Sequence, residues 1–584
     1  MKSTVVEKRW LAMGILILGV AAALRVSAIG ERSLSHPEMY VPGLPLPAGL
    51  SDPPPRHEFW PLVRDVVATD THPPGYYAMM WPVIRLAGAS EWSMRLPSAV
   101  CGVATVGFLM WLGLALGRPG AGLLAGALLA LNGYHIFWSQ AARMYSLAGM
   151  LALLSTLLLL KAAKAERSGW AAAWYCGVTL LGLATHVFMW SLLAAQIGWV
   201  AWAGWVRRGG MPGLLKWQWL TATMGTPLLA VAAYQSGNPV ATMSRDLLLC
   251  GGELMQFGFL WPRVQGRLDT FPPEWLEAQA SQSPYSLWWA ALLALGLWLV
   301  WEARREAGGG PVAWGGHRAS PGWRAVTLAA AAATGMDVML LQAAQTVALK
   351  APAVMRLTTV MAAAPLAGLI GFLILPRVWA WAGERHGSGG SVEEGPGGMR
   401  LVWLSAFGPP ALLWIFSMAA RPVMTPRGLL AVYPLVALLL ALGLIEASRD
   451  RRWVAAALAL ALIPIHIWSV REYSRRTMDP LHHKQFVERL RKQMQPSDLV
   501  FYPVGWANTP LLWYLPPERY RVIGWEFGAA RRKNPDARVW VLSTYGVAPA
   551  ERMTAAVGGY RRAGAVEAPH ARAELFEPAR DQER

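Results

Sequence analysis

Long apolar runs constrain this chain more than any other feature. About thirteen segments approach the roughly 20 apolar residues that a helix needs to cross a hydrocarbon core ~30 Å thick. Since 54% of the residues are apolar and only 15% are charged, the composition excludes a large soluble enzyme and is typical of a polytopic membrane protein. The predicted spans are 10–29, 96–117, 119–136, 144–163, 170–187, 188–206, 215–235, 285–303, 325–346, 357–376, 400–420, 428–447 and 452–470.

The net charge of +18 is explained by topology and does not require a nucleic-acid partner. Basic residues gather in alternate loops beside the span ends, which is the pattern of the positive-inside rule. The N-terminus is therefore expected in the cytoplasm, and with thirteen spans the C-terminal tail lies on the outer side. The clusters are Lys8/Arg9, Lys161/Lys164/Arg167, Arg207/Arg208/Lys216, Arg304/Arg305, Arg377/Arg385/Arg400 and Arg449/Arg451/Arg452.

The fold class predicted is mainly α and polytopic, with a small α/β domain at the C-terminal end. Residues 1–470 form the transmembrane module and 471–584 the extracytoplasmic domain; the long outer loops are 30–95 and 236–284. In the first loop, 75–87 is apolar and aromatic but too short to span, which predicts a helix lying in the membrane interface. In the tail we expect a helix carrying Phe486, Val487, Leu490 and Met494, strands at 498–503, 519–524 and 538–543, and a helix at 548–557.

The first outer loop carries an unusual concentration of reactive side chains. Two prolines and a glycine fix an irregular backbone in the segment Asp70–Tyr77, which also holds His72 and the phenols of Tyr76 and Tyr77. A second carboxylate, Glu38, follows the first span beside His36 and Pro37. A carboxylate in a partly dry cleft can act as a general base or bind a divalent metal. The alternative for these acids is a set of solvated loop charges.

Cations on the predicted outer face offer sites for a phosphate. Arg143 opens the fourth span, where a guanidinium can bind a phosphate bidentately or simply contact lipid head groups. Lys350, Arg356 and Arg427 lie on the same face by the predicted topology. Together these cations suit a lipid-linked phosphate or diphosphate, although an ordinary anionic phospholipid would also satisfy them.

The motifs that hold these residues resemble those of the GT-C glycosyltransferases, in the lipid-linked-sugar branch of the protein mannosyltransferases (family 39) and the aminoarabinose transferase. The resemblance covers residues 1 to about 165 by motif and the rest of the chain by pattern. In order, the motifs are Glu38 after span one, His72–Tyr77 (His-Pro-Pro-Gly-Tyr-Tyr), Glu91–Ser98 opening span two, Ser139–Ser146 opening span four and Pro426–Pro434 at span twelve.

The resemblance implies a fold in which outer loops and juxtamembrane helices form a cavity above the spans. It implies a polyprenyl-phosphate sugar as donor and a lipid, glycan or protein as acceptor. Glu38 is then the favoured catalytic base, and Asp70 is the second choice or binds acceptor or metal. The substrate-binding residues expected are His36, His72, Tyr76, Tyr77, Arg143, Tyr145, Lys350, Arg356 and Arg427.

Two departures from the family pattern bear on cofactors. Relatives commonly carry Asp-Glu where this chain has Pro37-Glu38, and Gln-Glu-Ala-Arg where it has Gln140–Arg143. One carboxylate thus stands where two are usual, so a divalent metal is possible but no cofactor is required by the sequence. Base-assisted attack by the acceptor predicts one in-line displacement, with inversion at the sugar.

Two other classes of function also fit a chain with many spans and outer cations. A flippase or transporter of lipid-linked oligosaccharide would place polar and helix-breaking features near the midplane, whereas here they gather in outer loops. A polymerase or ligase of surface polysaccharide would carry a long late outer loop, whereas the informative loop here is the first. Both readings stay open as alternatives to the transferase.

Overall fold

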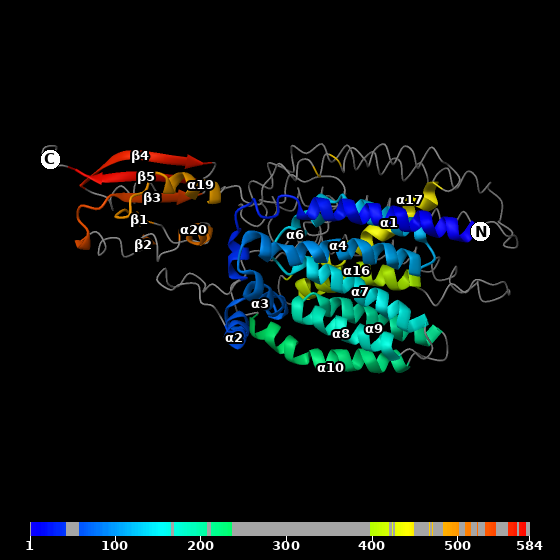
Figure 1. The fold of residues 1–584 in the computed structure, drawn as a ribbon. Coiled ribbons are helices and arrows are strands. Elements are labelled where there is room, and N and C mark those ends of the chain that lie inside the picture. The colour runs from blue at the N-terminus through cyan, green and yellow to red at the C-terminus, as the bar shows by residue number, and fades with distance from the viewer. Residues whose placement is uncertain are drawn as a thin grey trace, which may run out of the picture.

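The architecture is a helical bundle with short loop helices at one end and a separate sheet beyond them (Figure 1). It comes from a computed structural model of the chain. The structure describes residues 2–41, 58–164, 169–206, 212–235, 398–419, 423, 427–448, 467, 470, 483–501, 509–515, 522–523, 532–544, 559–568 and 571–579.

The bundle consists of apolar helices that run nearly side by side (Figure 1). Three of the described helices, α1, α4 and α7, are long and apolar enough to cross a membrane, or four spans if α5 and α6 count as one. The chain is thus an integral membrane protein. The helices are α1 (Lys2–Val26), α4 (Glu91–Ala115), α5 (Pro119–Ala130), α6 (Gly133–Ser139), α7 (Tyr145–Lys164), α8 (Gly169–Thr185), α9 (Met189–Val206), α10 (Pro212–Gln235), α16 (Gly398–Ala419) and α17 (Tyr433–Ser448).

The expected span at 119–136 is not one continuous helix. It divides into α5 and α6, which meet at 67°. Asn132 causes the division: its side chain accepts a hydrogen bond from the His135 backbone N–H (2.8 Å), so it caps α6, and its amide donates to the Tyr433 hydroxyl (2.6 Å). The predicted spans 285–303, 325–346 and 357–376 lie outside the described residues, as does nearly all of 452–470. The count of thirteen therefore stays a prediction.

The bundle places apolar side chains outside and polar ones inside, which is the arrangement that a lipid environment requires. On α1, Leu11, Ile15 and Leu16 are largely exposed, whereas Arg25 is fully buried. The Arg25 guanidinium donates to carbonyl oxygens of α1 and α5 and lies 2.8 Å from the His135 ring nitrogen. The two terminal nitrogens of Arg25 thus find their partners inside the protein.

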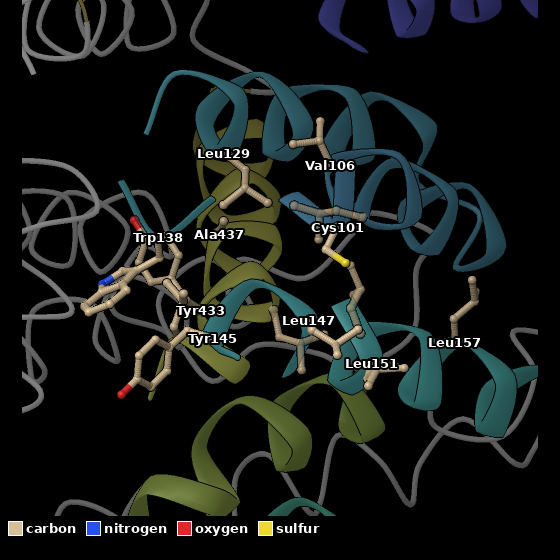
Figure 2. Packing of buried hydrophobic residues seen from close by; sticks show 14 of the residues in the cluster. Cys101, Val106, Leu129, Trp138, Tyr145, Leu147, Leu151, Leu157, Tyr433 and Ala437 are labelled. Carbon is tan, nitrogen blue, oxygen red and sulfur yellow. The ribbon is translucent and has the colours of Figure 1, made fainter. Parts of the chain in front are cut away.

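The bundle core joins helices that are distant in sequence. Side chains of α4, α5, α7 and α17 pack together, among them Cys101, Leu129, Leu151 and Ala437 (Figure 2). Aromatic residues, including Tyr145, gather at one end of this core (Figure 2).

Short helices of the first outer loop lie at the end of the bundle that faces the sheet (Figure 1). They are η1 (His36–Tyr40), α2 (Phe59–Thr69) and α3 (Gly75–Ala87). Helix α3 occupies the segment expected to form an interfacial helix. A glycine is required at its first residue, because a Cβ on Gly75 would lie 2.5 Å from the carbonyl oxygen of Ala184 in α8. This close approach brings the Asp70–Tyr77 turn against the end of α8.

The C-terminal region forms a five-stranded sheet in the order β2-β1-β3-β5-β4. Strand β1 is parallel to β2 and β3, and β5 is antiparallel to β3 and β4. The first three strands overlap the expected ones, the β4–β5 hairpin was not expected, and 548–557 lies outside the described residues. The elements are β1 (Leu499–Phe501), β2 (Val522–Ile523), β3 (Val539–Thr544), β4 (Tyr560–Ala568), β5 (Ala571–Pro578), and the helices α19 (His483–Arg491) and α20 (Thr509–Tyr514).

The C-terminal region is hydrogen-bonded to the first outer loop. The Tyr514 hydroxyl accepts a hydrogen bond from the Leu34 backbone N–H (2.8 Å) and donates to the Glu91 carboxylate (3.2 Å). The Lys484 backbone N–H donates to the Ser33 hydroxyl (2.9 Å), and its ammonium group lies 3.4 Å from Glu91. The tail therefore contacts both the start of η1 and the start of α4.

Candidate active site

Glu38 forms a buried ion pair with Arg95, the residue at the centre of the Glu91–Ser98 motif. Nε and Nη2 of the guanidinium donate to the two carboxylate oxygens at 2.7 and 2.8 Å, and both side chains are at most 1% exposed. The backbone N–H groups of Ser35 and Ala142 also donate to the carboxylate, as does the Ser35 hydroxyl. Five hydrogen bonds thus converge on Glu38, which approaches the capacity of a carboxylate.

The surroundings of Glu38 hold it in the ionised form. Burial by itself raises the pKa of the carboxyl group, but the charge and hydrogen bonds of Arg95 and the two backbone donors leave the pKa below its usual value. The pair also joins α4 to the chain before η1, because Arg95 donates to the backbone carbonyls of Ile29, Arg32 and Ser33. Glu38 is therefore placed to anchor the first loop on α4.

Asp70 is held in a different way, by a turn of its own chain. Its Oδ1 accepts hydrogen bonds from the backbone N–H groups of Thr71 (2.6 Å) and His72 (3.1 Å) and from His72 Nδ1 (2.8 Å). The end of α10 supports this turn, since the Gln235 amide donates to the carbonyl oxygens of Val66 and His72. The side chain of Asp70 remains 18% exposed and that of His72 16% exposed, so substrate can reach both.

Tyr77 joins the Asp70 carboxylate to a cation. Its hydroxyl donates to Oδ2 of Asp70 and accepts a hydrogen bond from Arg143 Nη1 at 3.3 Å. The same nitrogen of Arg143 donates to the Pro37 carbonyl oxygen (3.1 Å). A carboxylate and a guanidinium thus share one phenol hydroxyl.

Aromatic rings and a second cation complete the cluster. The Tyr145 ring centroid is 6.4 Å from that of His72 and 5.7 Å from that of His186, and the Arg427 guanidinium lies over the Tyr145 ring at 6.0 Å. Arg427 precedes Gly428, where any Cβ would overlap the ring of Phe188. The glycine lets this backbone pack closely beside Phe188, and the neighbouring Arg427 is thereby brought near Tyr145.

Burial and neighbouring charges shift the pKa values in this cluster. Burial raises the pKa of Asp70, but the hydrogen bond and charge of His72, the charge of Arg143 and the Tyr77 hydroxyl outweigh burial and leave it below its usual range. Burial lowers the pKa of His72, and the cations Arg143 and Arg427 lower it further against the opposing effect of Asp70. Burial raises the pKa of Tyr40 to about 12, with a further contribution from Asp70. At neutral pH the site holds a carboxylate, a neutral imidazole and neutral phenols.

The structure brings together six of the residues named from the sequence: Asp70, His72, Tyr77, Arg143, Tyr145 and Arg427. Tyr76 lies behind them, fully buried, with its hydroxyl 3.2 Å from that of Ser98. His36 begins η1, but its side chain is outside the described residues, as are Lys350 and Arg356.

Three residues of the site were not singled out from the sequence. Arg95 stands inside a motif that was recognised, but its partner is distant in the chain. Tyr40 ends the segment that contains Glu38. His186 lies at the outer end of the fifth predicted span, 170–187, and this position was a usable signal.

No group of three potential metal ligands exists among the residues that the structure describes. Glu38 is occupied by Arg95, and the carboxylate of Asp70 is engaged by His72 and Tyr77. The described donors therefore do not fit a metal centre, and we derive no step through a metal.

A family comparison bears on the resemblance inferred from the motifs. Residues 71–233 match the family model described as dolichyl-phosphate-mannose-protein mannosyltransferase. The match begins at the Asp70–Tyr77 turn and extends to α10, and it confirms the resemblance to membrane glycosyltransferases of the GT-C class. No curated protein matches the sequence significantly.

Several solved structures align with this chain at low similarity. ArnT from Cupriavidus metallidurans is 12% identical in the apo state, with 99% of this chain and 98% of that chain covered and a TM-score of 0.40. ArnT bound to undecaprenyl phosphate is 13% identical, with 96% and 97% covered and a TM-score of 0.41. The oligosaccharyltransferase AglB from Archaeoglobus fulgidus, with an inhibitory peptide and a dolichol-phosphate, is 11% identical, with 97% and 74% covered and a TM-score of 0.39.

Proposed function

We propose that this protein transfers a sugar from a polyprenyl-phosphate donor to a lipid, glycan or protein acceptor on the outer face of the membrane. Asp70 acts as the base, and Arg143 and Arg427 bind the phosphate. The family match over residues 71–233 supports the class of reaction. The residues that carry the chemistry are argued from the geometry of the site.

The observation that carries the proposal is the hydroxyl of Tyr77, which hydrogen-bonds both Asp70 and Arg143. Transfer from a prenyl-phosphate sugar needs a group that accepts the acceptor's proton and a cation that stabilises the departing phosphate. One phenol holds both groups at neighbouring positions, at the end of the bundle where the first loop packs.

Asp70 is a better candidate for the base than Glu38. The Glu38 carboxylate is fully buried and surrounded by five donors, so a proton could reach it only if the ion pair with Arg95 broke. Asp70 is partly exposed, and it accepts hydrogen bonds from its own turn and from Tyr77. The expectation that favoured Glu38 is therefore replaced by a proposal for Asp70.

The chemical step requires no group beyond these residues and the two substrates. The acceptor O–H or N–H gives its proton to Asp70 as the acceptor atom attacks the anomeric carbon. The bond from that carbon to the phosphate oxygen breaks, and prenyl phosphate leaves with one additional negative charge. Arg143 and Arg427 stabilise that charge. A single displacement inverts the configuration at the sugar.

The direct test measures transfer from a radiolabelled polyprenyl-phosphate sugar in membranes that contain the protein. We expect label in the acceptor fraction, with anomeric configuration opposite to that of the donor. Retention of configuration would contradict the single displacement. Movement of intact donor across the membrane without transfer would favour the flippase instead.

A further inference from the structure

His186 is a buried histidine, and among the described residues only one of its two ring nitrogens has a hydrogen-bond partner. It sits between α8 and α9 and is 4% exposed. Its Nδ1 accepts a hydrogen bond from the backbone N–H of Phe188 at 3.2 Å. A neutral imidazole that accepts at Nδ1 carries its proton on Nε2, so this contact fixes the tautomer.

The opposite edge of the His186 ring therefore presents an N–H donor. Within the described part of the chain this donor has no hydrogen-bond partner, although the rings of His72, Tyr145 and Phe188 all lie within 6 Å, at 5.8, 5.7 and 4.8 Å between centroids. No hydrogen bond links it to His72, whose own Nδ1 is engaged with Asp70. Nε2 is not one of the fully enclosed, unpartnered atoms of the described residues, so this N–H is open to the site and a ligand there can supply the acceptor.

The charges around His186 identify the kind of ligand. Burial holds the pKa of the ring well below its ordinary value, and the neighbouring His72, Arg427 and Arg143 lower it further. The ring is thus a neutral donor in a positive field. An acceptor that lies between such a donor and two guanidinium groups is most stable when it is an anion.

We propose that His186, as the Nε2–H tautomer, donates a hydrogen bond to the phosphate of the polyprenyl-phosphate donor and of the prenyl-phosphate product. The inference rests on the proposed function and deepens it, because it adds a neutral donor to the two cations at the same phosphate. A neutral donor adds a directional contact without adding a third positive charge that would oppose product release.

The test compares two ligands that differ only in the phosphate. Inhibition of transfer by undecaprenyl phosphate and by undecaprenol is measured for the wild-type protein and for His186→Gln, His186→Asn and His186→Phe. Gln extends an amide N–H to about the position of Nε2, whereas Asn keeps an acceptor for the Phe188 N–H but does not reach as far. Phe keeps the ring and removes both polar edges.

We expect His186→Phe and His186→Asn to weaken inhibition by undecaprenyl phosphate about tenfold or more. Inhibition by undecaprenol should be unchanged, and His186→Gln should stay near the wild type. Equal loss for both ligands would show a structural role and overturn the inference, as would unchanged phosphate inhibition in His186→Asn. A wild-type protein that neither transfers sugar nor binds undecaprenyl phosphate would instead contradict the proposed function itself.

Discussion

The first outer loop holds two carboxylates whose surroundings differ in one decisive respect. Glu38 is neutralised by a fixed guanidinium on α4 and is fully enclosed. Asp70 is held by its own turn, remains partly exposed and is linked to Arg143 through the hydroxyl of Tyr77. A charge matched completely inside the protein has little left to offer a substrate, whereas a charge matched in part can act on one.

The surroundings of the two carboxylates are nevertheless connected by hydrogen bonds. The Glu38 carboxylate accepts a hydrogen bond from the backbone of Ala142, the residue before Arg143, and Arg143 itself donates to the carbonyl of Pro37. The buried pair thus positions the backbone that carries Arg143, the cation proposed to bind the phosphate. Loss of Glu38 and loss of Asp70 would both impair transfer, but for different physical reasons, and the predictions below separate them.

The largest effect on catalysis is expected from Asp70→Asn. The Asn amide cannot take up the proton that the acceptor substrate releases, so the rate of transfer should fall about 10²- to 10⁴-fold. The matched control is Asp65→Asn, which changes an exposed acid of the same loop and should leave the rate unchanged. Transfer rates are compared per folded molecule, and a near-normal rate for Asp70→Asn would remove Asp70 from the mechanism.

The largest effect on stability is expected from Glu38→Gln. Removing one partner of a buried ion pair leaves Arg95 uncompensated and should lower the free energy of unfolding by about 3–5 kcal/mol. The thermal unfolding midpoint in detergent measures this, with Glu31→Gln, at an exposed site, as the control. An unchanged midpoint would show that the pair does not anchor the loop.

A smaller effect on catalysis is expected from Tyr77→Phe. The substitution removes the hydroxyl shared by Asp70 and Arg143, and transfer should slow about tenfold, as for loss of a hydrogen bond to a charged group. Tyr76→Phe is the matched control, because its hydroxyl contacts Ser98 and lies outside the bridge. Equal losses in the two variants would mean that the bridge has no special role.

Removal of the Tyr514 hydroxyl should have a modest structural effect. Tyr514→Phe loses the contacts to Leu34 and Glu91 and should lower stability by about 1 kcal/mol. The expected readout is a small fall in the thermal midpoint, with faster proteolysis between the bundle and the sheet. Unaltered proteolysis would show that this contact does not hold the two parts together.

The smallest effect is expected from pH. Asp70 must be ionised to act, and its pKa lies below the usual range, so activity should be lost only as the pH falls through that depressed value. Because the pKa of His72 is lowered, its imidazole is neutral at every pH above the ordinary histidine pKa of about 6.5. The transfer rate should therefore stay flat between pH 6.5 and pH 8, and an acidic limb in that interval would assign the base to another group.

The sequence predicted local features better than contacts between distant segments. Helix α3 coincides with the short apolar segment 75–87, which the sequence predicted as a helix too short to span. The gathering of Asp70, Arg143 and Arg427 followed from motifs in a family order. The division of 119–136 was missed, since its cause is a single capping residue, Asn132, inside an apolar run.

Contacts across the chain were beyond the sequence. Nothing in the composition of η1 indicates that Glu38 pairs with Arg95, 57 residues later. Without that pairing, the family resemblance favoured Glu38 as the base. His186 joins the site because α3 packs on α8 where Gly75 meets Ala184, a matter of backbone proximity. The β4–β5 hairpin was likewise missed.

The most direct test of the account is the transfer rate of the double variant Glu38→Gln, Arg95→Gln beside that of Asp70→Asn, each measured per folded molecule. The double variant removes both buried charges together and leaves two amides able to hydrogen-bond. We predict that it transfers sugar within about tenfold of the wild-type rate, whereas Asp70→Asn falls at least about 100-fold. A folded but inactive double variant beside an active Asp70→Asn would contradict the account and return the base to Glu38.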